Sequence, residues 1–235
     1  MWTTEQVGVA VWGDAASSWH FDLRGGECGI GLLAGEILHA DSMSVDQRHL
    51  SLVAVEGTRL PVASEHYVRG DKYFVNFPQG DGHYAIRLVL HPVKADEHLL
   101  VLSAKISIQT NLLDTHPMLD LVAEGTDVTT LERESAQENW RTSIETRATG
   151  SPPIVMVRGK SASTAVLLGP HDSPFTSNHS NDKRLCLRLF GDFLEKGVIR
   201  TAIPWIVVDR SADPQFSERL PRWHQQLCES PLPLS

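Results

Sequence analysis

Large apolar side chains fall at every second position in two parts of this chain. In the first part, residues 84–109, the alternation runs on both sides of a polar stretch at 94–97. Successive side chains of an extended chain point to opposite faces, so this spacing buries one face and leaves the other in water. The pattern predicts an antiparallel hairpin with a solvated outer side.

The second part with this alternation lies near the C-terminus. Leucines alternate over residues 185–189, and a second alternating run, residues 199–207, follows a polar turn at 191–197. We expect these two runs to pair with each other as a hairpin. Pro204 cannot donate a hydrogen bond to a ladder, so the strand that contains it should be an edge strand or carry a bulge.

Shorter strand-like runs, separated by turn residues, recur along the rest of the chain. They lie at 7–12, 19–23, 50–56, 66–69, 72–77, 117–123, 154–157 and 164–168. Phe216, Leu220, Trp223 and Leu227 are spaced as one face of a helix, which Pro221 should restart or kink. Many strands without a strand–helix–strand rhythm indicate an all-β, mainly antiparallel sandwich of two packed sheets with one short C-terminal helix.

The length of 235 residues allows one large β domain or two small ones. Gly150 and the two prolines after Ser151 mark a possible sub-boundary near 149–153. Because that break is short, we expect a single domain over 1–235, with a disordered tail at 229–235.

Residues 131–147 are ambiguous between helix and strand. Thr129 and Glu132 have the spacing of a helix capping box, whereas Trp140, Thr142 and Ile144 alternate as in a strand. We expect a short helical or irregular start and a strand from about residue 139.

Charge and cysteine content limit the possible partners and compartment. The net charge of -8 is unfavourable for nucleic-acid binding, which depends on neutralising phosphates with Lys and Arg. The first residues lack the features of a secretory signal, and no stretch has the roughly 18 apolar residues that a membrane span needs. Three scattered cysteines suit a reducing environment. We therefore expect a cytoplasmic protein that binds neither nucleic acid nor membrane.

No cofactor or metal site is expected. Residues 29–34 fit the glycine spacing of a dinucleotide-binding loop, but that loop works only between a strand and a helix of a parallel unit. The surroundings here are antiparallel in character, and Gly35 would lie inside the helix. No histidine or cysteine pairs have the spacing of zinc ligands.

Two regions contain candidate ligand-binding residues. The long polar loop at 169–183 supplies His171 and Asp172, and long loops without their own secondary structure are often functional. Asp114 and His116 leave a predicted strand together, so the carboxylate could orient the imidazole. An ordinary turn, with Pro117 stopping the strand, is the better-supported interpretation of the second pair.

Arg69 is a further candidate, because it lies at a turn between two strands and its guanidinium can grip a carboxylate or a pair of hydroxyls. An exposed charge at the end of a strand is the simpler interpretation.

Two functions remain open at this point. The first is a binding module that takes a small polar ligand, possibly a carbohydrate, or a protein partner through its rim loops. The alternative is a carbohydrate-active enzyme of the epimerase or mutarotase type, with acid–base chemistry supplied by His116, His171 and Glu195. Pairing of exposed strand edges could also give a homo-oligomer.

Overall fold

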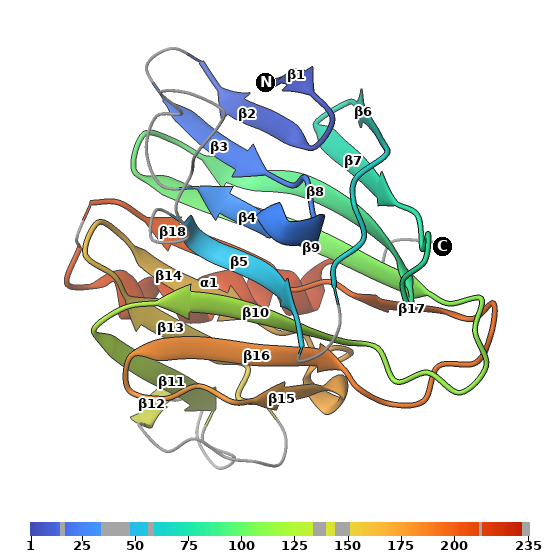
Figure 1. Cartoon of the computed structure of the whole chain (residues 1–235). Helices are drawn as coiled ribbons and strands as arrows, with labels where there is room; N and C mark the ends of the chain where they lie inside the picture. The colour runs from blue at the N-terminus through green and yellow to red at the C-terminus, as the bar shows by residue number, and fades with distance from the viewer. Residues whose placement is uncertain are drawn as a thin grey trace.

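The computed structural model describes residues 1–14, 17–33, 48–55, 59–133, 140–143, 151–211 and 213–231. Two antiparallel sheets pack face to face and form an all-β sandwich, with one helix near the C-terminus (Figure 1). The predicted fold class is therefore confirmed. The single-domain organisation stays a prediction. Among the described residues, no helix combines the length and apolarity required to cross a membrane.

The first sheet contains eight strands. In spatial order they are β1 (Trp2–Gln6), β2 (Val9–Gly13), β3 (Ser18–Asp22), β4 (Ile30–Leu33), β5 (Arg48–Ala54), β10 (Met118–Glu124), β16 (Arg184–Phe190) and β15 (Thr176–Asn178). The short 3-10 turns Gly26–Cys28 and Ser173–Phe175 precede β4 and β15. The glycine-spaced segment at 29–34 thus leads into the antiparallel strand β4, and its last residue lies outside the described residues.

The second sheet contains ten strands. Along its main path lie β12 (Trp140–Ser143), β11 (Asp127–Arg133), β13 (Ile154–Arg158), β14 (Ser163–Leu167), β18 (Trp205–Asp209), β9 (Leu99–Gln109), β8 (Ala85–Ala95), β7 (Lys72–Phe77) and β6 (Glu65–Arg69). The tenth strand, β17 (Ile199–Ala202), pairs with β9 beyond the end of β18.

The hairpin formed by β8 and β9 confirms the first alternating pattern. Ile86, Leu88 and Leu90 are buried between the sheets, and Ile106 pairs with Leu88 across the hairpin. At the turn, the Asp96 carboxylate accepts hydrogen bonds from the main-chain N–H groups of residues 98 and 99. Side-chain capping of this kind fixes a tight connection and therefore the register of both strands.

The expected pairing of residues 185–189 with 199–207 is wrong. β16 lies in the eight-stranded sheet between β10 and β15, whereas β17 and β18 pair with β9 in the other sheet. The chain changes sheets just after β16, where Phe190 and Gly191 both have positive φ values, 66° and 106°. Alternation reports which face of a strand is buried, but it does not identify the neighbouring strand.

The Pro204 prediction is met for one part of the run: β17 is an edge among the described residues, whereas β18 lies between β14 and β9. Residues 203 and 204 separate β17 from β18, and β17 forms an edge. The register with β9 continues unchanged across this gap, because Ala202 pairs with Ile106 and Trp205 pairs with Ser103. The Pro204 carbonyl also accepts a hydrogen bond from the Ala104 N–H.

In the ambiguous segment, the structure shows strands on both sides of a gap. Thr129 and Glu132 lie in β11, so the capping-box interpretation of these residues is wrong. The strand expected from about 139 is observed as β12, which pairs with β11. Residues 134–139 and 144–150 lie outside the described residues.

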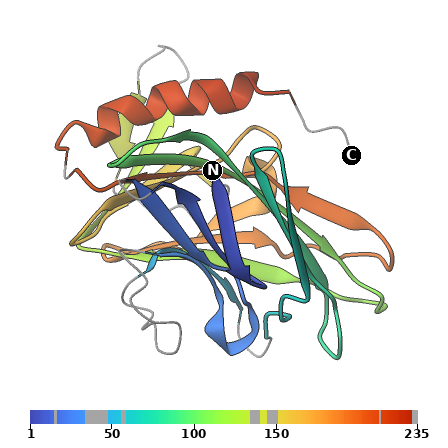
Figure 2. The same ribbon diagram turned by 90° about the horizontal axis from the view of Figure 1, so that it is seen from above.

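Helix α1 (Phe216–Glu229) covers part of the outer face of the ten-stranded sheet (Figure 2). Phe216 and Leu220 are fully buried in a second apolar cluster with Met156 and Leu167 of the strands beneath. The helix spans Pro221 as one element, so the prediction of a restart is not met. The apolar contacts with the sheet hold both sides of the proline in place.

Candidate functional site

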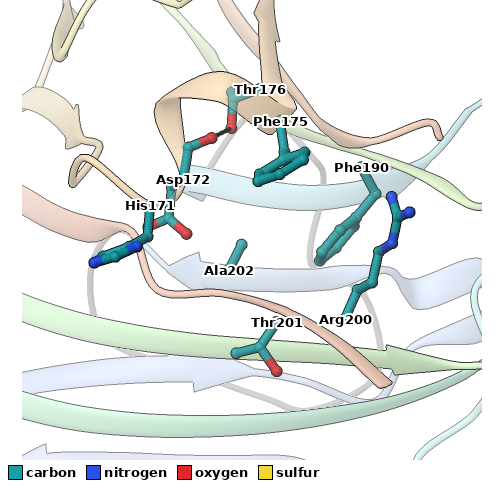
Figure 3. Close-up of a pocket in the computed structure, with 8 residues that line it drawn as sticks. All are labelled: His171, Asp172, Phe175, Thr176, Phe190, Arg200, Thr201 and Ala202. Atoms are coloured by element: carbon teal, nitrogen blue, oxygen red, sulfur yellow. Dashed lines mark hydrogen bonds between the residues drawn. The ribbon is translucent and has the colours of Figure 1, made fainter. Parts of the chain in front are cut away.

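A cavity of about 220 Å³ lies at the rim of the sandwich, where β17 and the end of β16 meet the loop before β15 (Figure 3). Its lining residues are His171, Asp172, Phe175, Thr176, Phe190, Arg200, Thr201 and Ala202. They come from both sheets and from one loop. The cavity is therefore formed jointly by the two sheets and the loop before β15.

The loop wall is held by its own hydrogen bonds. The Gly169 carbonyl accepts hydrogen bonds from the main-chain N–H groups of Asp172 and Ser173. The Thr176 hydroxyl donates to the Asp172 main-chain carbonyl at 2.9 Å. These bonds form a compact turn and place Phe175 at the mouth of the cavity, where its side chain is 55% exposed.

Asp172 is the most buried acidic group of the cavity, with 7% of its surface exposed. Both carboxylate oxygens lie 3.1 Å from the Ile203 main-chain N–H, which donates to them. Burial raises the pKa of this carboxyl above its ordinary value, although the Ile203 hydrogen bond and the nearby His171 act in the opposite direction. Asp172 therefore joins the loop wall to the chain between β17 and β18.

The part of the cavity formed by β16 and β17 combines an aromatic ring with a cation. Phe190 is the last residue of β16, and its positive φ is rare for a residue with a side chain. Arg200 projects from β17 and donates to Asp192 at 3.2 Å. The guanidinium carries further N–H donors beyond the one that this bond uses. Figure 3 shows Phe175 and Phe190 on the same side of the cavity, with Arg200 beside Phe190 and the His171 ring turned outward.

The structure brings two of the five predicted site residues together in the cavity and places the other three elsewhere. His171 and Asp172 line the cavity. The His116 ring lies against the Phe193 ring, with centroids 5.8 Å apart, and Asp114 occupies a turn with φ 56°. Arg69 is exposed at the end of β6. None of these last three residues lines the cavity.

The sequence did not identify Phe175, Phe190, Arg200 and Thr201 as site residues. Phe190 and Arg200 belong to different sheets, and the expected hairpin would have placed both in one sheet. The only local signal is Phe190 followed by Gly191 at the end of an alternating run, which is typical of a change in chain direction.

Comparison with known proteins gives no family. No family model matches the sequence, and no curated protein matches it. Among solved structures, the chain is similar to the alpha-galactosidase from Lactobacillus brevis, with 11% sequence identity and a TM-score of 0.43. The match covers 94% of this chain but 42% of that one. A likeness at this level assigns no function.

Proposed function

We propose that this protein is a binding module that holds one small group of a ligand in the rim cavity. The observation that supports this most is the combination of two phenylalanine rings, a guanidinium and a buried carboxylate in a single cavity. Ligand sites typically join an apolar lining with a few convergent polar groups in this way.

The size of the cavity limits what can enter. Its volume of about 220 Å³ is below the roughly 300–1,000 Å³ of sites for drug-sized ligands. A single sugar ring or one amino-acid side chain is therefore the appropriate size. Phe175 and Phe190 would contact an apolar face, and Arg200 would donate to a carboxylate or hydroxyl. Carbohydrates and segments of protein partners both present such groups.

A binding role fits the cavity better than the enzymatic alternative. Epimerase or mutarotase chemistry requires an acid and a base on opposite sides of one carbon. His171 and Asp172 are neighbours on one wall, His116 packs on Phe193, and Glu195 is exposed in the turn before β17. The described part of the cavity lining offers no second acid–base group opposite this wall.

The test uses Phe175→Ala with Phe193→Ala as the matched control. Phe193 is a similarly exposed ring that does not line the cavity. A thermal-shift screen of the full chain against monosaccharides and a displayed random-peptide library should find a ligand that stabilises the folded state. Phe175→Ala should weaken its affinity about tenfold, because an aromatic contact is removed. Phe193→Ala should leave its affinity unchanged.

Two results would contradict the proposal. One is a screen in which no probe raises the thermal midpoint of the wild-type chain. The other is a ligand whose affinity is the same for wild type, Phe175→Ala and Arg200→Gln. Both variants change exposed or half-exposed side chains, so a loss of binding can be separated from a loss of folding by circular dichroism.

A further inference from the structure

Within the described ranges, the main-chain edge of β17 has no strand partner on the side of the cavity. β18 pairs with β9 on one side and β14 on the other, with Leu167 opposite Trp205. β14 ends at Leu167, and the chain then leaves the sheet through the loop that forms the cavity wall. Among the described residues, no strand pairs with β17 in the place that β14 would occupy, while β17 continues along β9.

The alternation of hydrogen bonds shows which groups of β17 face this gap. Pro204 bonds to Ala104 of β9, so the even-numbered residues of this strand direct their main-chain groups toward β9. Ile203 consequently points the other way, where its N–H donates to Asp172. By the same alternation, the N–H and C=O groups of Thr201 and Ile199 point into the gap. No main-chain hydrogen bond from these two residues to another described residue is found on that side.

Asp172 already acts as a strand partner at one position. Its carboxylate accepts the Ile203 N–H as a ladder carbonyl would. The next group along the edge, at Thr201, borders the cavity directly. Along this edge, the Ile203 N–H has a hydrogen-bond partner, and the next main-chain groups, at Thr201, face the cavity that holds the two phenylalanine rings.

We propose that the ligand of this cavity is an extended peptide segment of a protein partner, which adds a strand to β17 in the place where β14 stops. This inference rests on the proposed binding function. In an antiparallel pair, two opposite residues exchange both N–H···O=C bonds, so a peptide residue has the donor and acceptor that Thr201 requires. A sugar ring has no such fixed pair of main-chain groups.

Strand geometry also places the side chains of the peptide. The residue opposite Thr201 shares the outward face of Thr201. Its two neighbours project to the face of Arg200 and Ala202, which is the cavity. One of them should be apolar and occupy the cavity, in contact with Phe175 and Phe190, and the other should be acidic and lie at its margin, where Arg200 can donate to it.

The surface around the cavity fits a protein partner. Exposed apolar side chains lie on the loop that lines the cavity and at the start of β17 with the turn before it. They are Phe175, Val198 and Ile199, with exposures of 55%, 41% and 62%. The open edge is short, because Asp172 closes one end and the turn at residues 195–198 closes the other. A flexible peptide fits this length better than a strand from the sheet of a second copy.

The experiment begins with a displayed random-peptide library enriched on the immobilised full chain. An enriched peptide is synthesised, and its affinity is measured by calorimetry for wild type, Thr201→Pro and Thr201→Ala. Proline removes the N–H that faces the gap and keeps the bonds to β9, because Thr201 does not use its N–H there. Thr201→Pro should weaken binding about tenfold, and Thr201→Ala should not, since it keeps the N–H.

A second arm keeps the test valid if Thr201→Pro fails to fold. The same peptide is N-methylated at the amide that should donate to Thr201, which removes one ladder bond without changing the protein. Affinity should again fall about tenfold, whereas methylation of the next amide along should have little effect.

Several outcomes would overturn the inference. They are peptides that bind equally well after both changes, a library that yields no peptide, or association of the chain with itself through this edge in light scattering. Monosaccharide binding that depends on Phe175, without peptide binding, would leave the proposed function standing and remove the peptide. If no ligand were found whose affinity depends on Phe175, the proposed function itself would be contradicted.

Discussion

The outer face of the ten-stranded sheet has two halves with opposite environments. Under α1, strands β14 and β18 are buried at every position. Away from the helix, β8 alternates between buried and more exposed positions along most of its length. One sheet therefore contains strands buried on both faces and strands buried on one. Burial on both faces follows from the cover supplied by a single helix.

The open half is stabilised by contacts among polar and aromatic side chains. Tyr67 and Phe74 stack with their ring centroids 4.6 Å apart and an interplanar angle of 8°. Arg87 donates to the Tyr67 hydroxyl at 2.9 Å, and its guanidinium lies 5.7 Å from the centre of the Phe74 ring. These groups keep contact with water, so each should contribute less to stability than a buried group of the covered half.

The largest expected difference between the halves is seen with two phenylalanines. Phe216→Ala in the covered half should lower the free energy of unfolding by about 3–5 kcal/mol, because it leaves a cavity under α1. Phe74→Ala in the open half should lower it by about 1 kcal/mol, through loss of the stacked pair. Urea denaturation of both variants provides the measurement. Equal losses would show that the two halves do not differ in this way.

A pH dependence should be specific to the covered half. His224 of α1 donates from Nε2 to the Leu168 carbonyl at 3.0 Å, and burial lowers the pKa of its ring. A lowered pKa means that the folded protein favours the neutral ring. The stabilisation is therefore complete above the ordinary pKa of 6.5 and is lost as the pH falls through the lowered value.

His224→Gln removes this titration and keeps a donor for the Leu168 carbonyl. Unfolding free energies measured between about pH 7.5 and 5 should fall more steeply for the wild type than for the variant. The effect should be smaller than that of Phe216→Ala, because the ring is only partly buried. Parallel curves would show that His224 does not contribute to the pH dependence.

The smallest expected effect belongs to Arg87 in the open half. Arg87→Ala removes the bond to Tyr67 and the contact with Phe74, and should cost about 0.5–1 kcal/mol. Lys105→Ala is the control. Lys105 lies on β9, opposite Val89 of β8, and it is a cation on the same open face of the sheet. If the two substitutions gave the same shift in the urea midpoint, the Arg87 contacts would add nothing to stability.

The two halves also explain which parts of the fold were predictable. Apolar and polar residues alternate in a sequence only where one face of a strand is exposed to solvent. The β8–β9 hairpin could therefore be predicted from the sequence. The continuous apolar strands of the covered half, such as β13, could be recognised as strands but not assigned a face. The partner of β16 was mispredicted for a related reason, since burial patterns do not identify neighbouring strands.

The candidate site was predictable only where it is local. His171 and Asp172 follow from one long polar loop, which a sequence displays directly. Phe190 and Arg200 come together because two sheets end side by side, and this depends on strand order. Asp114 and His116 show the converse case, because residues close in sequence stand at the rim without entering the cavity.

The unchanged register across Pro204 determines which side chains of β17 face the cavity. Orientation along this strand depends only on odd or even residue number, counted back from β18. Insertion of one residue between Ala202 and Trp205 would turn the side chains of Arg200 and Ala202 toward solvent and the side chain of Thr201 toward the inner face. An insertion of two residues would restore their orientation. Which side chains line the cavity therefore depends on whether the segment between β17 and β18 has an even or an odd number of residues.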